Sequence, residues 1–117
     1  MYELRNHTPH PVTLVLADGS TAELAPSPPT PRCVVRRVPD GRAETARGLV
    51  PLTRTDLTGT VTDEPPDTPG VLRIVARGVV EALPDRGDLV FPDDLVRDEH
   101  GRVVACRALG RVRRPGG

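Results

Sequence analysis

Apolar and polar positions form their clearest pattern over residues 70–109, where they predict a strand, a short helix, a second strand and a hairpin in succession. After the turn signal Pro69-Gly70 comes an apolar run that is typical of a half-buried strand: Val71, Leu72, Ile74 and Val75. The spacing of the apolar residues then becomes that of a helix near residues 77–83, which Pro84 ends. One face of this helix is apolar and is made by Val75, Val79, Val80 and Leu83. Because Gly78 and the valines weaken helix formation, a continuing strand is the alternative here.

The end of this stretch predicts a second strand and a hairpin. Leu89–Phe91 is a short apolar run closed by Pro92. Residues 95–98 and 102–106 then flank Glu99-His100-Gly101, whose glycine can take the positive φ that a tight loop requires.

The first 24 residues predict a short strand followed by a hairpin. Tyr2–Arg5 alternates apolar and polar residues, and Asn6–Pro11 then imposes a turn. Val12–Leu16 and Thr21–Leu24 flank Asp18-Gly19, which is a strong signal for a β-hairpin.

Prolines mark surface connections in the middle of the chain. Ala25–Pro31 holds four prolines in seven residues, so we predict an extended loop, with a docking segment for a proline-recognition domain as the alternative. Cys33–Val38 predicts a strand that ends at the turn triplet Pro39-Asp40-Gly41. Arg42–Gly48 has no apolar stripe, and we expect a loop or the tip of a long hairpin there.

Three further segments connect this part to the region described first. Leu49–Thr55 contains Pro51, which confines it to a sheet edge or a bulge. Leu57–Thr62 predicts another short strand, and Asp63–Pro69 is a second proline-rich linker.

The composition favours a small β-rich fold. The chain of 117 residues has 16 Val and 12 Leu against one Phe, one Tyr and no Trp, so its core is aliphatic and its β-branched residues favour strands. We predict an α+β, β-rich fold, with a mostly antiparallel sheet or partial barrel of about six to eight short strands and one short helix. Residues 1–110 are expected to form a single domain, and residues 111–117 a mobile basic tail.

Charge and side-chain chemistry argue against several functions. All 16 basic side chains are Arg, so a lysine Schiff base and a lysine-dependent phosphate loop are excluded. Ser20 and Ser27 are the only serines, and neither lies in a nucleophile elbow. The net charge of zero argues against a dedicated nucleic-acid binder. Residues 81–99 are acidic and residues 102–114 basic, which we interpret as complementary charges on neighbouring strands, with a basic tail that grips an acidic partner as the alternative.

The sequence also predicts where the protein works. No apolar stretch approaches the ~20 residues of a membrane span, and the N-terminus lacks the layout of a signal peptide. We therefore expect a cytoplasmic protein without a membrane partner, in which Cys33 and Cys106 are reduced, buried thiols.

The chain contains three short motifs: Asn6-x-Thr8-Pro9-His10, Gly59-x-Val61 ahead of the apolar Ile74-Val75, and Val96-Arg97-Asp98-Glu99-x-Gly101-Arg102. In this combination, over residues 6–109, the chain resembles a family of small proteins of phages, prophages and actinobacterial genomes that begin with an Asn-Leu-Thr-Pro-His signature. His7 stands where the signature has Leu, which predicts a more exposed turn. The resemblance implies a context, that of small phage proteins that bind host proteins or sequester signalling nucleotides.

Metal-assisted chemistry is the first candidate for a site. Four side chains could supply imidazole and thiolate ligands for zinc: His7, His10, Cys33 and Cys106. Neither cysteine belongs to a CxxC pair, so we predict no metal and no cofactor, and expect the Asn6 and Thr8 side chains to bond to nearby backbone instead. The carboxylates of Asp93, Asp94, Asp98 and Glu99 could hold a cation, but their turn context favours a solvated, structural role.

Arginines are the second candidate. We predict a ligand-binding set made of His10 and six arginines: Arg36, Arg37, Arg54, Arg73, Arg77 and Arg107. Guanidinium forks suit bidentate contact with phosphate or carboxylate. Arg73 and Arg107 sit among apolar strand residues and are expected to emerge on the opposite face. Convergence on one concave surface would favour an anionic ligand, and surface salt bridges are the alternative.

We therefore expect a non-enzymatic binding or interaction protein of phage or prophage type. Its partner would be a protein, or a small anionic ligand such as a nucleotide held by the arginines. Formation of a homo-oligomer through an exposed strand edge is one route to such a site. The alternatives are a small metal-assisted enzyme that uses His10 with Asp94 or Asp98, and a virion or other structural component.

Overall fold

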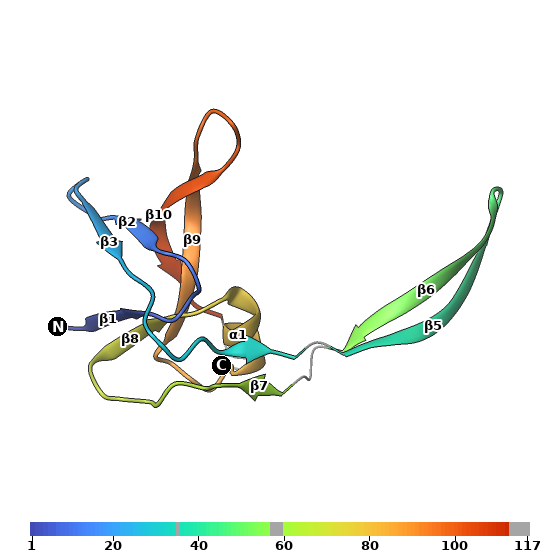
Figure 1. Ribbon diagram of the computed structural model, residues 1–117, viewed down its shortest axis with the longest axis horizontal. Helices are drawn as coiled ribbons and strands as arrows, with labels where there is room; N and C mark the ends of the chain where they lie inside the picture. Colours follow the sequence, from blue (N-terminus) through green and yellow to red (C-terminus); the bar gives the residue numbers. More distant parts are fainter. Residues whose placement is uncertain (35, 57–59, 113–117) are drawn as a thin grey trace.

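The computed structural model describes residues 1–34, 36–56 and 60–112, which form a β-rich fold with one short helix, as the sequence predicts. The elements are β1 (Glu3–Asn6), β2 (Val12–Val15), β3 (Thr21–Leu24), β4 (Arg32–Cys33), β5 (Arg36–Thr45), β6 (Gly48–Asp56), β7 (Val61–Thr62), β8 (Val71–Ile74), α1 (Arg77–Ala82), β9 (Leu89–Arg97) and β10 (Val103–Gly110). Six strands form a nearly closed barrel, the β4–β7 ribbon lies beside it, and the β5–β6 ribbon projects away from it (Figure 1).

The barrel sheet has the strand order β1-β8-β9-β10-β2-β3 and a mixed pairing. β8 is parallel to β1 and β9, and β10 is parallel to β2, whereas β9–β10 and β2–β3 are antiparallel. The expectation of a mostly antiparallel sheet is therefore corrected for the barrel. Turn signals reveal hairpins because these are local, but no turn joins β1 to β8, so the sequence carries no local signal for their direction.

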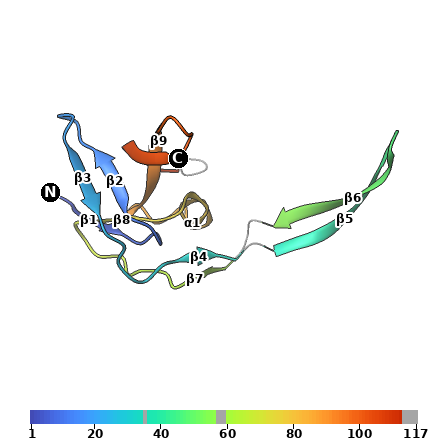
Figure 2. The same ribbon diagram turned by 45° about the horizontal axis from the view of Figure 1, so that its top comes forward.

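Contacts between β1 and the segment after β3 close the barrel. Asn6 forms a parallel bridge with Pro26, and the Ser27 N–H donates to the Asn6 carbonyl at 2.7 Å. Figure 2 shows β1, β2 and β3 on the side of the molecule away from β5 and β6. The closure covers strand edges that would otherwise be open to pairing with another chain.

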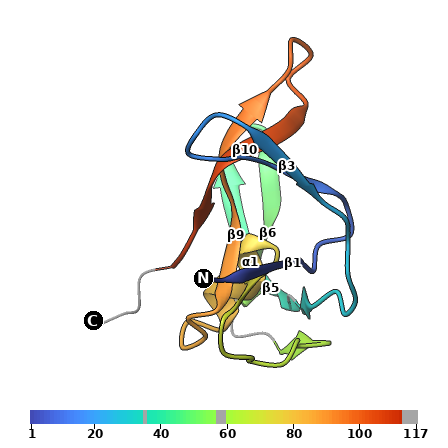
Figure 3. The same ribbon diagram turned by 90° about the vertical axis from the view of Figure 1, so that its left-hand side faces the viewer.

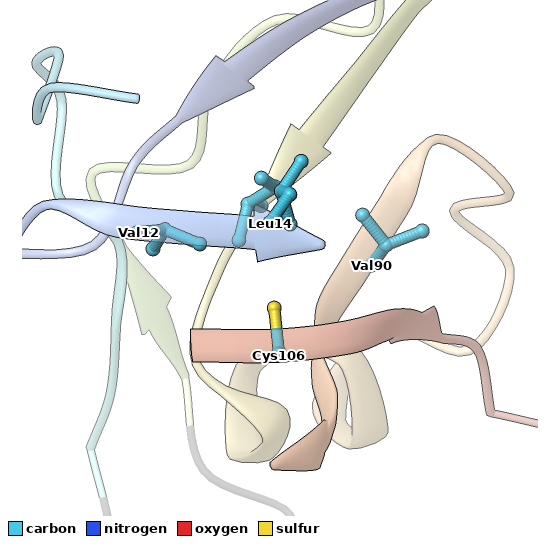
Figure 4. Close-up of a cluster of buried hydrophobic side chains, with 5 residues drawn as sticks. Val12, Leu14, Val90 and Cys106 are labelled. Carbon is cyan, nitrogen blue, oxygen red and sulfur yellow. The ribbon is translucent and has the colours of Figure 1, made fainter. Parts of the chain in front are cut away.

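Two clusters of buried apolar side chains form the core. Inside the barrel, Val12, Leu14, Val90 and Cys106 point toward one another (Figure 4), and the fully buried Ile74 completes the cluster. The second cluster lies between α1 and the sheet and consists of Val75, Val79, Val80, Leu89 and Phe91. The aliphatic core predicted from composition is thus divided between the two faces of β9.

The helix is the one that the change of period predicts. α1 spans Arg77–Ala82 and buries Val79 and Val80 against the sheet. The Leu83 N–H closes its last turn onto the carbonyls of those two valines, at 3.1 and 3.2 Å. The alternative of a continuing strand is wrong. Because Pro84 lacks an N–H, the helix cannot continue past this turn.

Both predicted hairpins are confirmed as β2–β3 and β9–β10. Gly19 in the first turn has φ +87°, and Gly101 in the second has φ +78°. Only glycine adopts such angles without strain, so these two residues fix where the strands reverse.

The middle of the chain forms one long ribbon. β5 continues through Pro39-Asp40-Gly41, where the sequence predicts a turn, and a β-bulge between Pro39 and Arg42 absorbs this triplet. A bulge places an extra residue in one strand without ending the pairing, and Gly41, at φ +77°, supplies the required backbone angle. Of the two alternatives for Arg42–Gly48, the tip of a long hairpin is confirmed. Pro51 lies in β6, which has a single neighbour, as the prediction of an edge requires.

Three predictions fall partly outside the described residues. The strand expected over Cys33–Val38 includes residue 35, and its described parts belong to two strands, β4, which ends at Cys33, and β5, which begins at Arg36. The strand expected over Leu57–Thr62 includes residues 57–59, and only its end is described, as β7 paired with β4. The predicted tail is described only at Arg111 and Val112.

Candidate functional site

Arg73 lies within the barrel fold and is held by internal contacts. Its side chain is 10% exposed, and its Nη1 lies 2.9 Å from His7 Nε2. Its Nη2 donates to the Thr68 hydroxyl at 3.0 Å, and its Nε, which forms no hydrogen bond, lies 4.0 Å from an Asp88 carboxylate oxygen. Its place among apolar residues had predicted that Arg73 emerges on an outer face. Instead, its side chain is buried and makes contacts within the fold.

His7 is the partner that allows an arginine to be buried here. The ring is 2% exposed, and its Nδ1 lies 3.0 Å from the carbonyl oxygens of both Ser27 and Pro29. Carbonyl oxygens only accept, so these partners assign the proton to Nδ1 and leave Nε2 to accept from Arg73. The exposed turn predicted at His7 is wrong, because both ring nitrogens are satisfied inside the fold.

The rest of the Asn6–His10 motif completes the closure of the barrel. Asn6 Nδ2 donates to the carbonyls of His10 and Leu24, at 2.8 and 3.0 Å, and Asn6 Oδ1 accepts from the Thr8 N–H at 2.9 Å. The predicted bonding of these polar side chains to nearby backbone is confirmed. The His10 side chain is exposed, and the motif that carries the family resemblance serves the fold.

Arg86, which the sequence analysis did not single out, makes a more extensive set of contacts. Its Nε and Nη2 grip both carboxylate oxygens of Asp88, at 2.8 and 2.7 Å, and its Nη1 reaches Glu64 at 2.9 Å and the Pro65 carbonyl at 2.8 Å. Hydrogen bonding from Arg86 holds the pKa of the Asp88 carboxyl below its ordinary value of 3.8, against the opposing effect of burial. The contacts of Arg86 join the linker before β8 to the turn before β9. Nothing in the spacing of the charged residues distinguishes it from an ordinary surface pair.

The remaining predicted arginines lie on three different elements. Arg77 on α1 pairs with Glu81 at 2.9 Å and lies 5.1 Å from the centre of the Phe91 ring. Arg107 on β10 is exposed and 3.9 Å from Asp94. The other three, Arg36, Arg37 and Arg54, lie on the β5–β6 ribbon. The six arginines are therefore not brought to one concave surface.

The candidate metal ligands are also separated. In the described part of the chain, no three His, Cys, Asp or Glu side chains are grouped so that they could hold a metal ion. Cys106 is buried with its Sγ 3.7 Å from the Thr13 carbonyl, and burial raises the pKa of its thiol. Cys33 lies apart on β4 and is half-buried.

The acids of the β9–β10 hairpin shape its turn. Asp98 Oδ1 accepts the N–H groups of His100 and Arg102, at 2.8 and 3.0 Å. Side-chain acceptors of this kind stabilise a tight turn locally. Asp94 has φ +49°, a conformation that Asp tolerates in turns and bulges.

The most distinctive surface is the β5–β6 ribbon, residues 36–56, which we call the arm. Its strands contain ten and nine residues, and every described side chain in it is exposed or half-exposed. Figure 1 shows the arm projecting beyond β4 and β7, away from the barrel. The radius of gyration is accordingly 17.7 Å, whereas a compact domain of this length has about 13 Å.

One face of the arm is apolar. Cross-strand pairing places Val38 opposite Arg54 and Ala43 opposite Val50, and strand alternation places Leu52 on the same face. Val50 and Leu52 are 45% and 44% exposed, and no other element packs extensively against them. We call Val38, Ala43, Val50 and Leu52 the apolar face. Leu49, opposite Glu44, lies on the other side.

The barrel carries a second exposed apolar surface. A groove of about 110 Å³ lies where β2 meets the β9–β10 hairpin and is lined by Pro11, Val12, Thr13, Pro92, Leu95, Val103, Val104, Ala105 and Cys106. We call it the β2–β10 groove. Figure 3 shows the hairpin rising beyond the barrel at this place. Its exposed rim includes Leu95 and Val104.

Among the described residues, no helix has the length and apolar character needed to cross a membrane. Comparison with protein-family models, with curated proteins and with solved structures finds no match for this chain.

Proposed function

We propose that this chain is a non-enzymatic interaction protein that binds a protein partner through the apolar face of its arm. The observation that supports this most is the long two-stranded ribbon that packs against no other element to a significant extent. Ordering a residue costs about 1–2 kcal/mol of backbone entropy, and an isolated hairpin is marginally stable in water. A partner that covers Val50 and Leu52 would supply the missing apolar burial.

The charges of the arm favour a protein partner with an acidic surface. Residues 36–56 contain five arginines and three acids, and no arginine among them forms an ion pair with a side chain that the structure describes. Arg36 and Arg54 thus keep a binding role in this proposal, on the same side of the arm as the apolar face, whereas Arg37, opposite Thr55, lies on the other side. A small anionic ligand is less well supported, because Arg73 is used internally and Arg77 and Arg107 lie on other elements. The phage or prophage context still rests on the resemblance of the motifs.

Site-specific photo-crosslinking tests the proposal. A photoreactive amino acid placed at Leu52 of the full chain, in its native cells, is expected to give a discrete adduct with one protein, which mass spectrometry identifies. The same amino acid at Tyr2, which is 61% exposed on the barrel, serves as the control. If the yield of adducts from Leu52 and Val50 does not exceed the yield from Tyr2, the arm is not the docking element.

A further inference from the structure

The rest of the chain offers a surface that fits the arm. We infer that the apolar face of one copy packs into the β2–β10 groove of a second copy, and that the second copy does the same in return, so that the protein forms a closed two-fold dimer. This inference rests on the proposed function and names its partner. A single two-fold axis relates the two contacts, so the apolar faces of both arms are covered.

The two surfaces match in chemistry. The apolar face presents valine, leucine and alanine side chains, and the groove presents the same class from Leu95, Val103 and Val104. Val103 and Val104 are 50% and 49% exposed, although β10, the strand that contains them, is paired with β9. Contiguous apolar side chains left open on two surfaces of one small chain are a recognised mark of an interface.

The arm is basic, and the rest of the described chain is acidic. The arm has five arginines and three acids, whereas residues 1–34 and 60–112 together have nine arginines and thirteen acids. Asp93 and Asp94 are exposed beside Pro92 and Leu95 at the wall of the groove. A basic arm is therefore attracted to the barrel of another copy, while two arms repel each other.

The exposed area is of the size that such a dimer would cover. The chain exposes 8421 Å², whereas a compact monomer of 12.6 kDa exposes about 6,200 Å². The excess is about 2,200 Å² per chain, and a stable interface buries about 1,200–2,000 Å² in total from both partners. A reciprocal pair could thus form a standard interface and still leave part of each arm exposed.

The groove of the same chain is not within the arm's reach in this structure. The arm leaves the molecule beyond β4 and β7, and β2 and β3 lie on the other side of the barrel (Figure 1). The apolar face of the arm is therefore left exposed, and the groove that could cover it must come from a second copy of the chain.

Contact through the face fits the arm better than the strand-edge pairing expected from the sequence. β5 contains Pro39 and β6 contains Pro51, and neither proline has an N–H to offer to an added strand. Each edge of the arm is therefore interrupted. Prolines at exposed edges hinder pairing with further strands, and they leave the faces free.

Sedimentation velocity of the full chain tests the inference. At about 50 μM the protein is expected to have twice its 12.6 kDa mass. Replacing Val50 and Leu52 with Asp, or Leu95 and Val104 with Asp, is expected to weaken the dimer at least about 100-fold, because each places charges in the apolar contact. The matched control replaces Leu49 and Thr53, on the other side of the arm, with Asp and should change the dimer constant less than about threefold. Circular dichroism confirms that each variant is folded.

Mixing the two disrupted variants identifies the contact. One variant retains an intact groove and the other an intact apolar face, so the mixture should form a heterodimer through one of the two contacts. A groove variant that stays dimeric, an arm variant that stays dimeric, or assemblies larger than a dimer would each overturn the inference. A monomeric wild-type protein would overturn it too, and an adduct from Leu52 with a different protein would then leave the proposed function standing.

Discussion

Replacement of Arg73 with Met is expected to lower the free energy of unfolding by about 3–5 kcal/mol. The substitution leaves the buried Nε2 of His7 and the Thr68 hydroxyl without their donor. A buried polar atom that loses its partner carries the full cost of its desolvation. Urea denaturation monitored by circular dichroism measures the loss. The matched control is Arg77→Ala, an exposed arginine on α1, which should cost about 1 kcal/mol or less.

A double substitution separates the lost hydrogen bond from a general loss of packing. His7→Leu together with Arg73→Met removes both polar partners, so the pair is replaced by apolar side chains of related shape. The double variant should therefore be more stable than Arg73→Met alone, with a coupling energy of about 1–3 kcal/mol. A loss below about 1 kcal/mol for Arg73→Met, or strict additivity of the two changes, would contradict the network described here.

Replacement of Arg86 with Ala is expected to cost about 2–4 kcal/mol at pH 7. It removes the bidentate bond to Asp88 and the bonds to Glu64 and the Pro65 carbonyl, and it leaves a carboxylate that is 9% exposed without its main partner. Arg102→Ala is the control, since that arginine is 75% exposed and pairs with Asp98 within one hairpin. Its cost should stay near 0.5 kcal/mol or below.

The cost of Arg86→Ala should also depend on pH. Because Arg86 lowers the pKa of Asp88 in the folded state, the stabilisation is present above the ordinary value of 3.8 and is lost as the pH falls through the lowered value. The difference between the wild-type protein and Arg86→Ala should therefore be largest near neutral pH and shrink below about pH 4. Denaturation curves at a series of pH values measure it. An equal difference at all pH values would show that the Arg86–Asp88 pair is not the cause.

Local features of the fold follow from the sequence because their signals are local. The Asp18-Gly19 and Glu99-His100-Gly101 turns fix the β2–β3 and β9–β10 hairpins, and the spacing of Val75, Val79 and Val80 predicts α1. The parallel pairs have no comparable signal, since β1 meets β8 only after the chain has passed through the arm. The bulge at Pro39-Asp40-Gly41 uses the same residues as a turn, so composition cannot tell the two apart.

The candidate site was harder to predict than the fold, because the environment of a charged residue depends on distant partners. The buried Arg73 is hydrogen-bonded to His7, which lies 66 positions away in the sequence. Arg86 meets Glu64 across a linker, which spacing does not reveal. The arm is a candidate docking element because no other part of the chain packs extensively against its apolar face. A sequence pattern can place Leu49–Thr55 at a sheet edge, but only the three-dimensional arrangement shows that the apolar face is left uncovered.

Hydrogen–deuterium exchange of the backbone amides tests whether the arm is left without support from its own barrel. Because no other element of the chain packs extensively against the arm, the amides of β5 and β6 in dilute, monomeric protein should exchange orders of magnitude faster than those of β8, β9 and β10. Protection of the arm should then appear when the concentration is raised or the partner identified by crosslinking is added. Arm amides that are as protected as barrel amides in the dilute monomer would show that the arm packs on its own chain, and would contradict a docking role for its apolar face.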